Sequence, residues 1–271
     1  MYIFLAYILY KIKHKLDKLC LDISVSLAIM RITINASPNF STKIRPKKNI
    51  KFVIIHYTGM QSKIESINRL KNIKSKVSCH YFIDRKGIIS QMIKDNKVAW
   101  HAGKSKWKTF RNLNENSIGI ELVNKGHEFG YQNFSNIQII KLIDLCKNLK
   151  KKYKIKKENF LGHSDIAPLR KIDPGEKFPW KKLSKYKIGC WHGDNQKKLK
   201  LINQKNIENL FFKNLFKIGY RYFKINKRER RKDKLIIKSF QQHYFPQNTS
   251  GKIDKKTFKI SYFLANKLYL T

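Results

Sequence analysis

The sequence predicts an α/β domain, with a central β-sheet covered by helices, followed by a small domain of three helices. Short apolar runs rich in β-branched residues alternate with stretches of helical periodicity as far as residue 153, and beyond residue 206 only helical periodicity remains. The chain has 271 residues, of which 42% are hydrophobic, which is enough for one or two packed domains. Wholesale disorder is therefore excluded.

The first half of the chain supplies the predicted strands. Lys51–His56 is a buried strand that ends on a histidine, and residues 64–73 repeat isoleucine and leucine at helical spacing. Residues 80–84 and 88–93 flank the turn Asp84-Arg85-Lys86-Gly87, which predicts a hairpin with glycine where the turn needs a positive φ. Ser117–Val123 is a further strand.

One long helix and a polar loop complete the first domain. Ser135 followed by Gln138 is a capping box, and the apolar face behind it runs to Tyr153 and includes Cys146. Residues 162–175 form a loop that contains two prolines. The four cysteines are too widely spaced to indicate a disulfide framework or a thiolate zinc site.

The apolar pattern lapses at about residues 189–204 and resumes as helical stretches. We therefore predict an N-terminal extension over 1–29, a first domain over 30–191, a linker over 192–205 and a helical domain over 206–271. The extension is either a short membrane-associating anchor or spurious, with translation starting at Met30. We expect no transmembrane span, because the apolar run at residues 1–10 is far shorter than the roughly 20 residues required.

The formal net charge is +41, from 59 lysines and arginines against 18 aspartates and glutamates. Such a charge suggests an anionic partner, and nucleic acid first of all. However, 49 of the basic residues are lysines spread over the whole chain, whereas specific base recognition depends on arginine. A solvated lysine surface is the alternative, and we expect no nucleic-acid partner.

Three residues form a candidate metal site. His56 ends a buried strand, His163 lies in Gly162-His163-Ser164-Asp165, and Asp173 precedes Pro174. Two imidazoles and one carboxylate are the ligand set of a catalytic zinc that keeps its fourth position for water. Taken singly, each has a structural alternative, such as a strand-end histidine or an aspartate in a turn.

Two further residues are candidates for catalysis. Glu121 lies within the strand Ser117–Val123 and faces away from its apolar neighbours, so it is either a general base beside the metal or a solvent-facing glutamate. Lys171 lies two residues before Asp173, which places both side chains on the same side of an extended loop. Its ammonium group could stabilise a developing oxyanion.

Taken together, the motifs resemble the zinc-dependent N-acetylmuramoyl-L-alanine amidases, a family shared with phage lysozyme-type amidases and peptidoglycan recognition proteins. Seven blocks occur in the family's order between Met30 and about Trp191, and their joint occurrence is highly specific. The blocks are Ile34–Phe40, Phe52–Gly59, Val77–Asp84, Ala99–Gly103, Ser117–Leu122, Gly162–Ile166 and Lys171–Gly175.

The resemblance implies a mixed central sheet and an enzyme that cuts the amide bond between N-acetylmuramic acid and L-alanine. It also implies that His56, His163 and Asp173 bind one Zn²⁺, that Glu121 activates the water, and that Lys171 polarises the carbonyl. Because all five positions are present, an active enzyme is favoured over a catalytically inactive recognition protein.

One position departs from the family's pattern. The phage branch has a tyrosine before the hairpin histidine, whereas this chain has Cys79, which leaves proton transfer to Glu121. His80, Trp100 and His101 resemble the lining of the family's substrate groove, with core packing as the alternative. We expect the histidines that match no block to lie on the surface: His14, His127, His192 and His243.

The C-terminal region resembles the three-helix peptidoglycan-binding domain that follows such amidases, through residues 218–220, 240–243 and 250–254. The alternative is a helical domain that only caps the first domain. We expect peptidoglycan or its muropeptides as the partner of a monomer in the cell envelope, periplasmic or membrane-associated, with a cytoplasmic recycling enzyme as the alternative. A non-catalytic peptidoglycan-binding protein is the second functional hypothesis.

Overall fold

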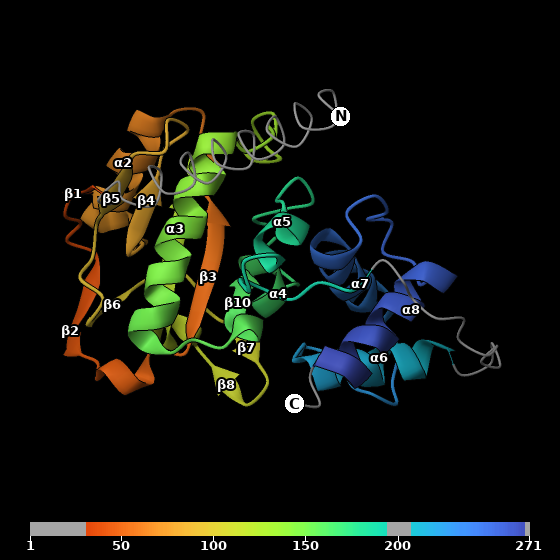
Figure 1. Cartoon of the computed structure of the whole chain (residues 1–271). Helices are drawn as coiled ribbons and strands as arrows, with labels where there is room; N and C mark the ends of the chain where they lie inside the picture. Colours follow the sequence, from red (N-terminus) through yellow and green to blue (C-terminus); the bar gives the residue numbers. More distant parts are fainter. Residues whose placement is uncertain (1–30, 194–206, 269–271) are drawn as a thin grey trace, which may run out of the picture. The chain divides into compact units, whose positions relative to one another are not determined.

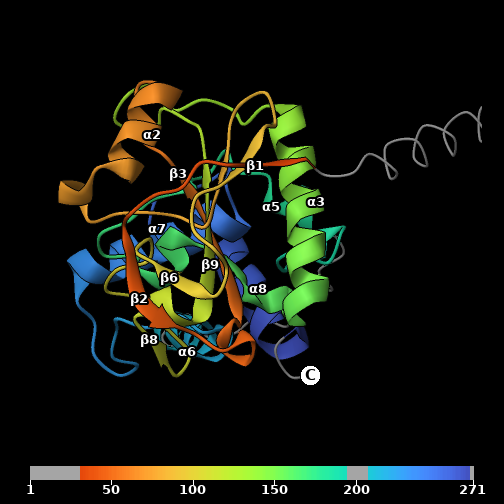
Figure 2. The ribbon, with the colours of Figure 1, turned by 90° about the vertical axis from the view of Figure 1, so that its left-hand side faces the viewer.

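The computed structural model describes residues 31–193 and 207–268, so the predicted extension 1–29 and nearly all of the predicted linker 192–205 lie outside the described residues. At its centre is a six-stranded sheet in the order β1-β5-β4-β9-β3-β10 (Figures 1 and 2). The strands β4, β9, β3 and β10 are parallel neighbours, whereas β5 is antiparallel to β4, which confirms the mixed sheet. In chain order the strands are β1 (Ile32–Ile34), β3 (Phe52–Tyr57), β4 (Tyr81–Ile83), β5 (Ile89–Gln91), β9 (Ser117–Leu122) and β10 (Phe160–Gly162).

The β4–β5 hairpin forms at the predicted turn. The carboxylate of Asp84 accepts hydrogen bonds from the backbone amides of Lys86 and Ile88, both at 2.9 Å. Gly87 has a φ of 79°, a conformation that L side chains rarely adopt. The side chain of Asp84 and the missing side chain of Gly87 therefore set the turn together.

The helix α3 (Asn136–Tyr153) lies along one face of the sheet (Figure 1). Ser135 caps it as predicted, accepting from the amide of Gln138 at 3.3 Å. The reciprocal half of the predicted capping box is wrong, because the Gln138 side chain donates to the carbonyls of Ile83 at 3.0 Å and Val123 at 3.2 Å. It thereby fixes the start of α3 to the ends of β4 and β9. Cys146 is fully buried on the apolar face, as predicted.

Shorter elements border the sheet. They are α2 (Lys63–Lys71), α4 (His163–Ile166), α5 (Trp180–Ser184), and two antiparallel pairs, β2 (Phe40–Ile44) with β6 (Lys97–Ala99) and β7 (Lys106–Trp107) with β8 (Phe110–Arg111).

Within the described ranges, no helix combines the length and the apolar character that crossing a membrane would require.

The C-terminal region consists of α6 (Ile207–Ile218), α7 (Arg230–Tyr244) and α8 (Lys255–Phe263), followed by a π-helical turn at Leu264–Leu268, which confirms the three helical stretches. Its core is continuous with that of the sheet. One cluster of buried side chains includes Phe52 and Ile54 of β3, Trp107 of β7, Phe211 of α6 and Phe240 of α7. The domain boundaries at 191 and 206 stay predictions.

This shared core predicts that the helices and the sheet unfold together. Replacing the fully buried Phe240 by alanine should lower the free energy of unfolding by about 3–5 kcal/mol, because the cavity borders both parts. Urea unfolding followed by tryptophan fluorescence and far-UV circular dichroism should show one coincident transition. Leu235→Ala on the same helix, 37% exposed, is the control and should cost roughly 0.5 kcal/mol. Two separate transitions, with only one shifted by Phe240→Ala, would contradict the prediction.

Candidate functional site

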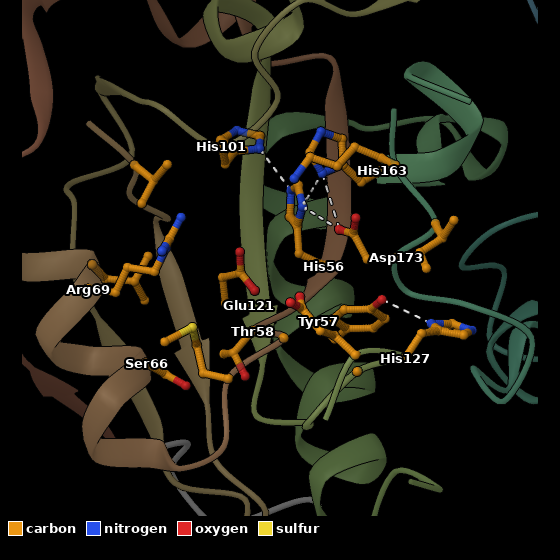
Figure 3. Close-up of a pocket in the computed structure, with 18 of the residues that line it drawn as sticks. His56, Tyr57, Thr58, Ser66, Arg69, His101, Glu121, His127, His163 and Asp173 are labelled. Atoms are coloured by element: carbon orange, nitrogen blue, oxygen red, sulfur yellow. Dashed lines mark hydrogen bonds and ion pairs between the residues drawn. The ribbon is translucent and has the colours of Figure 1, made fainter. Parts of the chain in front are cut away.

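The three predicted metal ligands come together at the carboxyl edge of the sheet (Figure 3). His56 occupies the fifth position of β3, His163 is the first residue of α4 directly after β10, and Asp173 lies in the loop that follows. The Nδ1 atom of His56 lies 3.0 Å from Nδ1 of His163 and 3.0 Å from Oδ2 of Asp173. His163 Nδ1 lies 3.2 Å from the same Oδ2 atom, and all three residues are buried.

The protonation of this cluster suits a divalent metal. Burial, and then the neighbouring His163, lower the pKa of His56 to about 4, so its ring is neutral near pH 7. Burial alone would raise the pKa of Asp173, but His163 and His56 beside it bring that pKa below its ordinary value. A neutral imidazole and an ionised carboxylate are the forms that bind metal, and two imidazoles with one carboxylate fit a catalytic zinc.

A chain of hydrogen bonds sets the tautomer of His56. The hydroxyl of Ser117 donates to the carbonyl of Leu113 at 2.5 Å, so its oxygen accepts from Nε2 of His101 at 3.2 Å. Burial lowers the pKa of His101, which leaves one proton on its ring. Its Nδ1 atom therefore accepts from Nε2 of His56 at 3.0 Å. This leaves Nδ1 of His56 without a proton and directed at His163 and Asp173, as a metal ligand requires.

Alternate residues of β9 face the metal-ligand cluster and His101. Ser117, Gly119 and Glu121 share that face because side chains alternate along a strand. A Cβ atom on Gly119 would lie 2.3 Å from Cγ of His101, so only glycine leaves room for that ring. In the pattern Ser-x-Gly-x-Glu, the serine thus accepts a hydrogen bond from His101, the glycine leaves room for the His101 ring, and the glutamate supplies a carboxylate.

Glu121 pairs in register with His56 across β9 and β3, so both side chains leave the sheet on the same face. Its Oε2 atom is buried and has no hydrogen-bond partner among the described residues. Burial, and then Asp173, raise the pKa of Glu121, while Lys171 and Arg69 oppose that rise. A carboxylate held in this way costs stability, and it is suited to accept a proton inside the pocket.

The cluster opens into a cavity of about 550 Å³ (Figure 3). Trp100, His101 and Lys171 line it, and their roles in the groove and in catalysis stay predictions. His80 is not among the lining residues. It is fully buried, and its Nδ1 accepts from the amide of Gly119 at 3.0 Å, so it lies in the core, which was the alternative to a place in the groove. Other lining residues, for which no role was expected from the sequence, are Tyr57, Thr58, Ser66, Arg69, Phe129 and Arg170.

Two histidines expected on the surface differ in exposure. His243 is 3% exposed, so the prediction is wrong for this residue. His127 is exposed, as expected, and also lines the cavity, where its Nδ1 lies 3.0 Å from the hydroxyl of Tyr57 and its Nε2 lies 3.1 Å from Glu176. Arg69, at the opposite side of the cavity, has no distinguishing sequence signal, because it is one of 59 basic residues.

Comparison with known proteins agrees with this geometry. The N-acetylmuramoyl-L-alanine amidase family matches residues 46–176. The amidase AmiD of Escherichia coli is 33% identical over 234 residues, which cover 80% of this chain and 83% of AmiD. The 1,6-anhydro-N-acetylmuramyl-L-alanine amidase AmpD of Haemophilus influenzae is 33% identical over 164 residues, which cover 54% of this chain and 86% of AmpD.

Solved structures show the same fold over most of the chain. AmiD of Escherichia coli, in complex with anhydro-N-acetylmuramic acid-L-Ala-D-gamma-Glu-L-Lys, superposes with a TM-score of 0.70 at 30% identity, covering 84% of this chain and 93% of that one. AmpDh3 of Pseudomonas aeruginosa superposes with a TM-score of 0.74 at 29% identity, covering 86% of this chain and 98% of that one. The matched length includes helices beyond the sheet domain.

The hydrogen-bond chain through His101 predicts a metal-binding phenotype. His101→Ala should weaken zinc affinity about 10- to 100-fold, because His56 loses the acceptor that fixes its tautomer. Competition titration of the metal-free protein with a chromophoric chelator measures this affinity. Trp100→Ala is the matched control, since Trp100 lines the same cavity without a hydrogen bond to a ligand. Equal zinc affinity in His101→Ala and the parent protein would show that zinc binding does not depend on the hydrogen bonds through His101.

Proposed function

The chain belongs to the family of N-acetylmuramoyl-L-alanine amidases, and we propose which of its residues carry out the reaction. It hydrolyses the amide bond between N-acetylmuramic acid and L-alanine in peptidoglycan or its muropeptide fragments. The non-catalytic alternative is not favoured. The observation that carries the assignment of roles is that His56, His163 and Asp173 share one cavity with Glu121, whose buried Oε2 atom has no hydrogen-bond partner among the described residues.

His56, His163 and Asp173 would hold one Zn²⁺ in this proposal. Their two imidazole nitrogens and one carboxylate oxygen lie within 4.8 Å of one another, which supports a common ligand. Zinc bound there supplies a Lewis acid that makes water acidic near neutral pH. The protein contributes the hydrogen bonds that keep both rings oriented, including the carbonyl of Ala102, which lies 3.1 Å from Nε2 of His163.

Glu121 is the general acid and base. It takes a proton from the attacking water while the water oxygen bonds to the lactyl carbonyl carbon, and returns the proton to the nitrogen of L-alanine as the C–N bond breaks. The low solvent access of the Glu121 carboxylate supports this role because it raises the pKa of the carboxyl, which lets the proton be held and released. Lys171 lines the same cavity, where its ammonium stabilises the negative charge on the carbonyl oxygen.

Arg69 supplies a contact for the stem peptide. It is exposed at the edge of the cavity, and no hydrogen bond of its guanidinium is found among the described residues. The ligand bound to AmiD contains a γ-linked glutamate, and that linkage leaves the α-carboxylate free. A planar guanidinium matches a carboxylate in two parallel hydrogen bonds. We therefore assign the α-carboxylate of a γ-linked glutamate to Arg69.

The substrate is cell-wall material, and we place the enzyme in the cell envelope. The alignment with AmiD extends over 80% of the chain, whereas that with AmpD of Haemophilus influenzae covers 54%, which supports an enzyme whose C-terminal helices take part in its function. We also propose that these helices bind peptidoglycan, a role that agrees with the same location. Cytoplasmic recycling of anhydro-muropeptides is the alternative.

The roles of the metal and of Glu121 are tested with a defined muropeptide. Glu121→Gln should reduce kcat by at least about 100-fold and retain zinc, because the glutamate is a proton carrier and not a ligand. Exhaustive chelation should abolish hydrolysis, and added Zn²⁺ should restore it. Release of new L-alanine amino termini is the measurement. Hydrolysis that persists without zinc, or in Glu121→Gln, would overturn the mechanism.

The role of Arg69 is tested with two substrates that differ at one group. Arg69→Ala should raise KM about tenfold for a muropeptide with a free glutamate α-carboxylate, because a charged hydrogen-bond partner is lost. The same substitution should leave KM unchanged when that carboxylate is amidated. Lys71→Ala, on the same helix but outside the cavity lining, is the control. An equal rise in KM for both substrates would contradict the assignment.

A further inference from the structure

The C-terminal helices contact the turn that carries His163 through a buried carboxylate. Asp165 lies two residues after His163 in α4 and is 1% exposed. Its Oδ2 atom accepts from the amide of Gly162 at 2.7 Å and from Nδ1 of His243, on α7, also at 2.7 Å. Its Oδ1 atom accepts from the hydroxyl of Tyr220, just beyond the end of α6. Both oxygens are therefore used, and two of the three donors come from the C-terminal helices.

A second contact holds the same turn from its backbone. The hydroxyl of Ser239, on α7, donates to the carbonyl of Ser164 at 2.8 Å, and both residues are buried. The amide of Ser164 donates in turn to the carbonyl of Asp173 at 2.8 Å. The backbone between Gly162 and Asp165, which includes His163, is thus bonded to α7 on one side and to the loop of Asp173 on the other.

The His243 ring is itself held in one orientation. It stacks on the Trp180 ring of α5 at 4.0 Å between centroids with an interplanar angle of 13°, and on Tyr244 at 3.9 Å with 11°. Tyr220 is fully buried within the core cluster that the helices share with the sheet. His243 and Tyr220 are therefore rigid donors that fix the position of the Asp165 carboxylate. Because this carboxylate is deeply buried, no water can replace a donor that is lost.

We propose that Tyr220, Ser239 and His243 are positioning residues of the metal site, through which the C-terminal helices hold His163 in place. The proposal rests on the proposed role of His163 as a zinc ligand. Metal ligands must be held within about 0.5 Å of their productive geometry, and loss of an outer-shell partner commonly weakens metal binding. The helices therefore form part of the active-site scaffold, whatever contact they also make with peptidoglycan.

The test uses the full chain and single substitutions that preserve ring shape. Tyr220→Phe and His243→Phe each remove one donor to Asp165 and keep an aromatic ring in the core. Each should weaken zinc affinity about 10- to 100-fold and alter the visible absorption spectrum of the cobalt-substituted protein. His243→Asn, whose amide can donate in place of Nδ1, should recover part of the lost affinity. Ser239→Ala, a smaller change that preserves the fold most readily, should weaken zinc affinity in the same direction.

Gln241→Met is the matched control for a general loss of stability. Gln241 lies on the same helix and is fully buried, but it bonds to Gly251, Lys252 and Thr257 of the C-terminal region and not to α4. This variant should lose thermal stability without a change in zinc affinity or cobalt spectrum.

Two outcomes would overturn the proposal in different ways. If the parent protein binds zinc and Tyr220→Phe, His243→Phe and Ser239→Ala bind it equally well, the helices only cap the sheet domain. If Gln241→Met weakens zinc affinity as much as His243→Phe, the effect is one of general stability and not of positioning. Failure of the parent protein to bind zinc would instead overturn the proposed metal site, and the positioning role with it.

Discussion

The parallel pairing of β3 with β9 on one side and with β10 on the other is the constraint on which the site depends. It brings the carboxyl ends of three strands to one edge, so that His56, Glu121 and His163 meet although they are far apart in sequence. A shift of one residue between β3 and β9 would turn His56 or Glu121 to the opposite face. Asp173 comes from a loop, and the hydrogen bond from the amide of Ser164 ties that loop to the same edge.

The features that the sequence could predict are those with short-range signals. The strand that carries His56, the turn at Gly87 and the cap at Ser135 each depend on neighbours within a few residues, and all three are present, although the strand runs one residue further, to Tyr57. The parallel pairing of the short strand β1 with β5 had no such signal. Nor could periodicity show that His243 bonds to Asp165, since these residues are 78 positions apart. The side chain of Gln138 was mispredicted because its partners, two strand carbonyls, are equally remote in sequence.

The scarcity of acidic residues gives each buried carboxylate a large structural role. Only 18 aspartates and glutamates are present, and Asp84, Asp95, Asp165 and Asp173 are among the buried polar residues. Asp95 alone joins its own loop to β4 and to the end of α3, accepting from Tyr81 at 2.7 Å, Lys152 at 2.8 Å and Tyr153 at 2.5 Å. Because these negative charges lie inside the protein, most lysine side chains in the described part of the chain remain unpaired with them at the surface. There they are solvated and lie apart from the reaction.

The absence of a side chain at Gly119 limits how this site could be transferred to another scaffold. Copying the three ligands and the glutamate would reproduce every group that contacts metal or water, and the graft would still fail if the host strand carried alanine at that position. One methyl group there would displace His101, and His56 would then be free to carry its proton on the nitrogen that should face the metal. A designer must therefore treat an empty volume as one of the components to be transplanted.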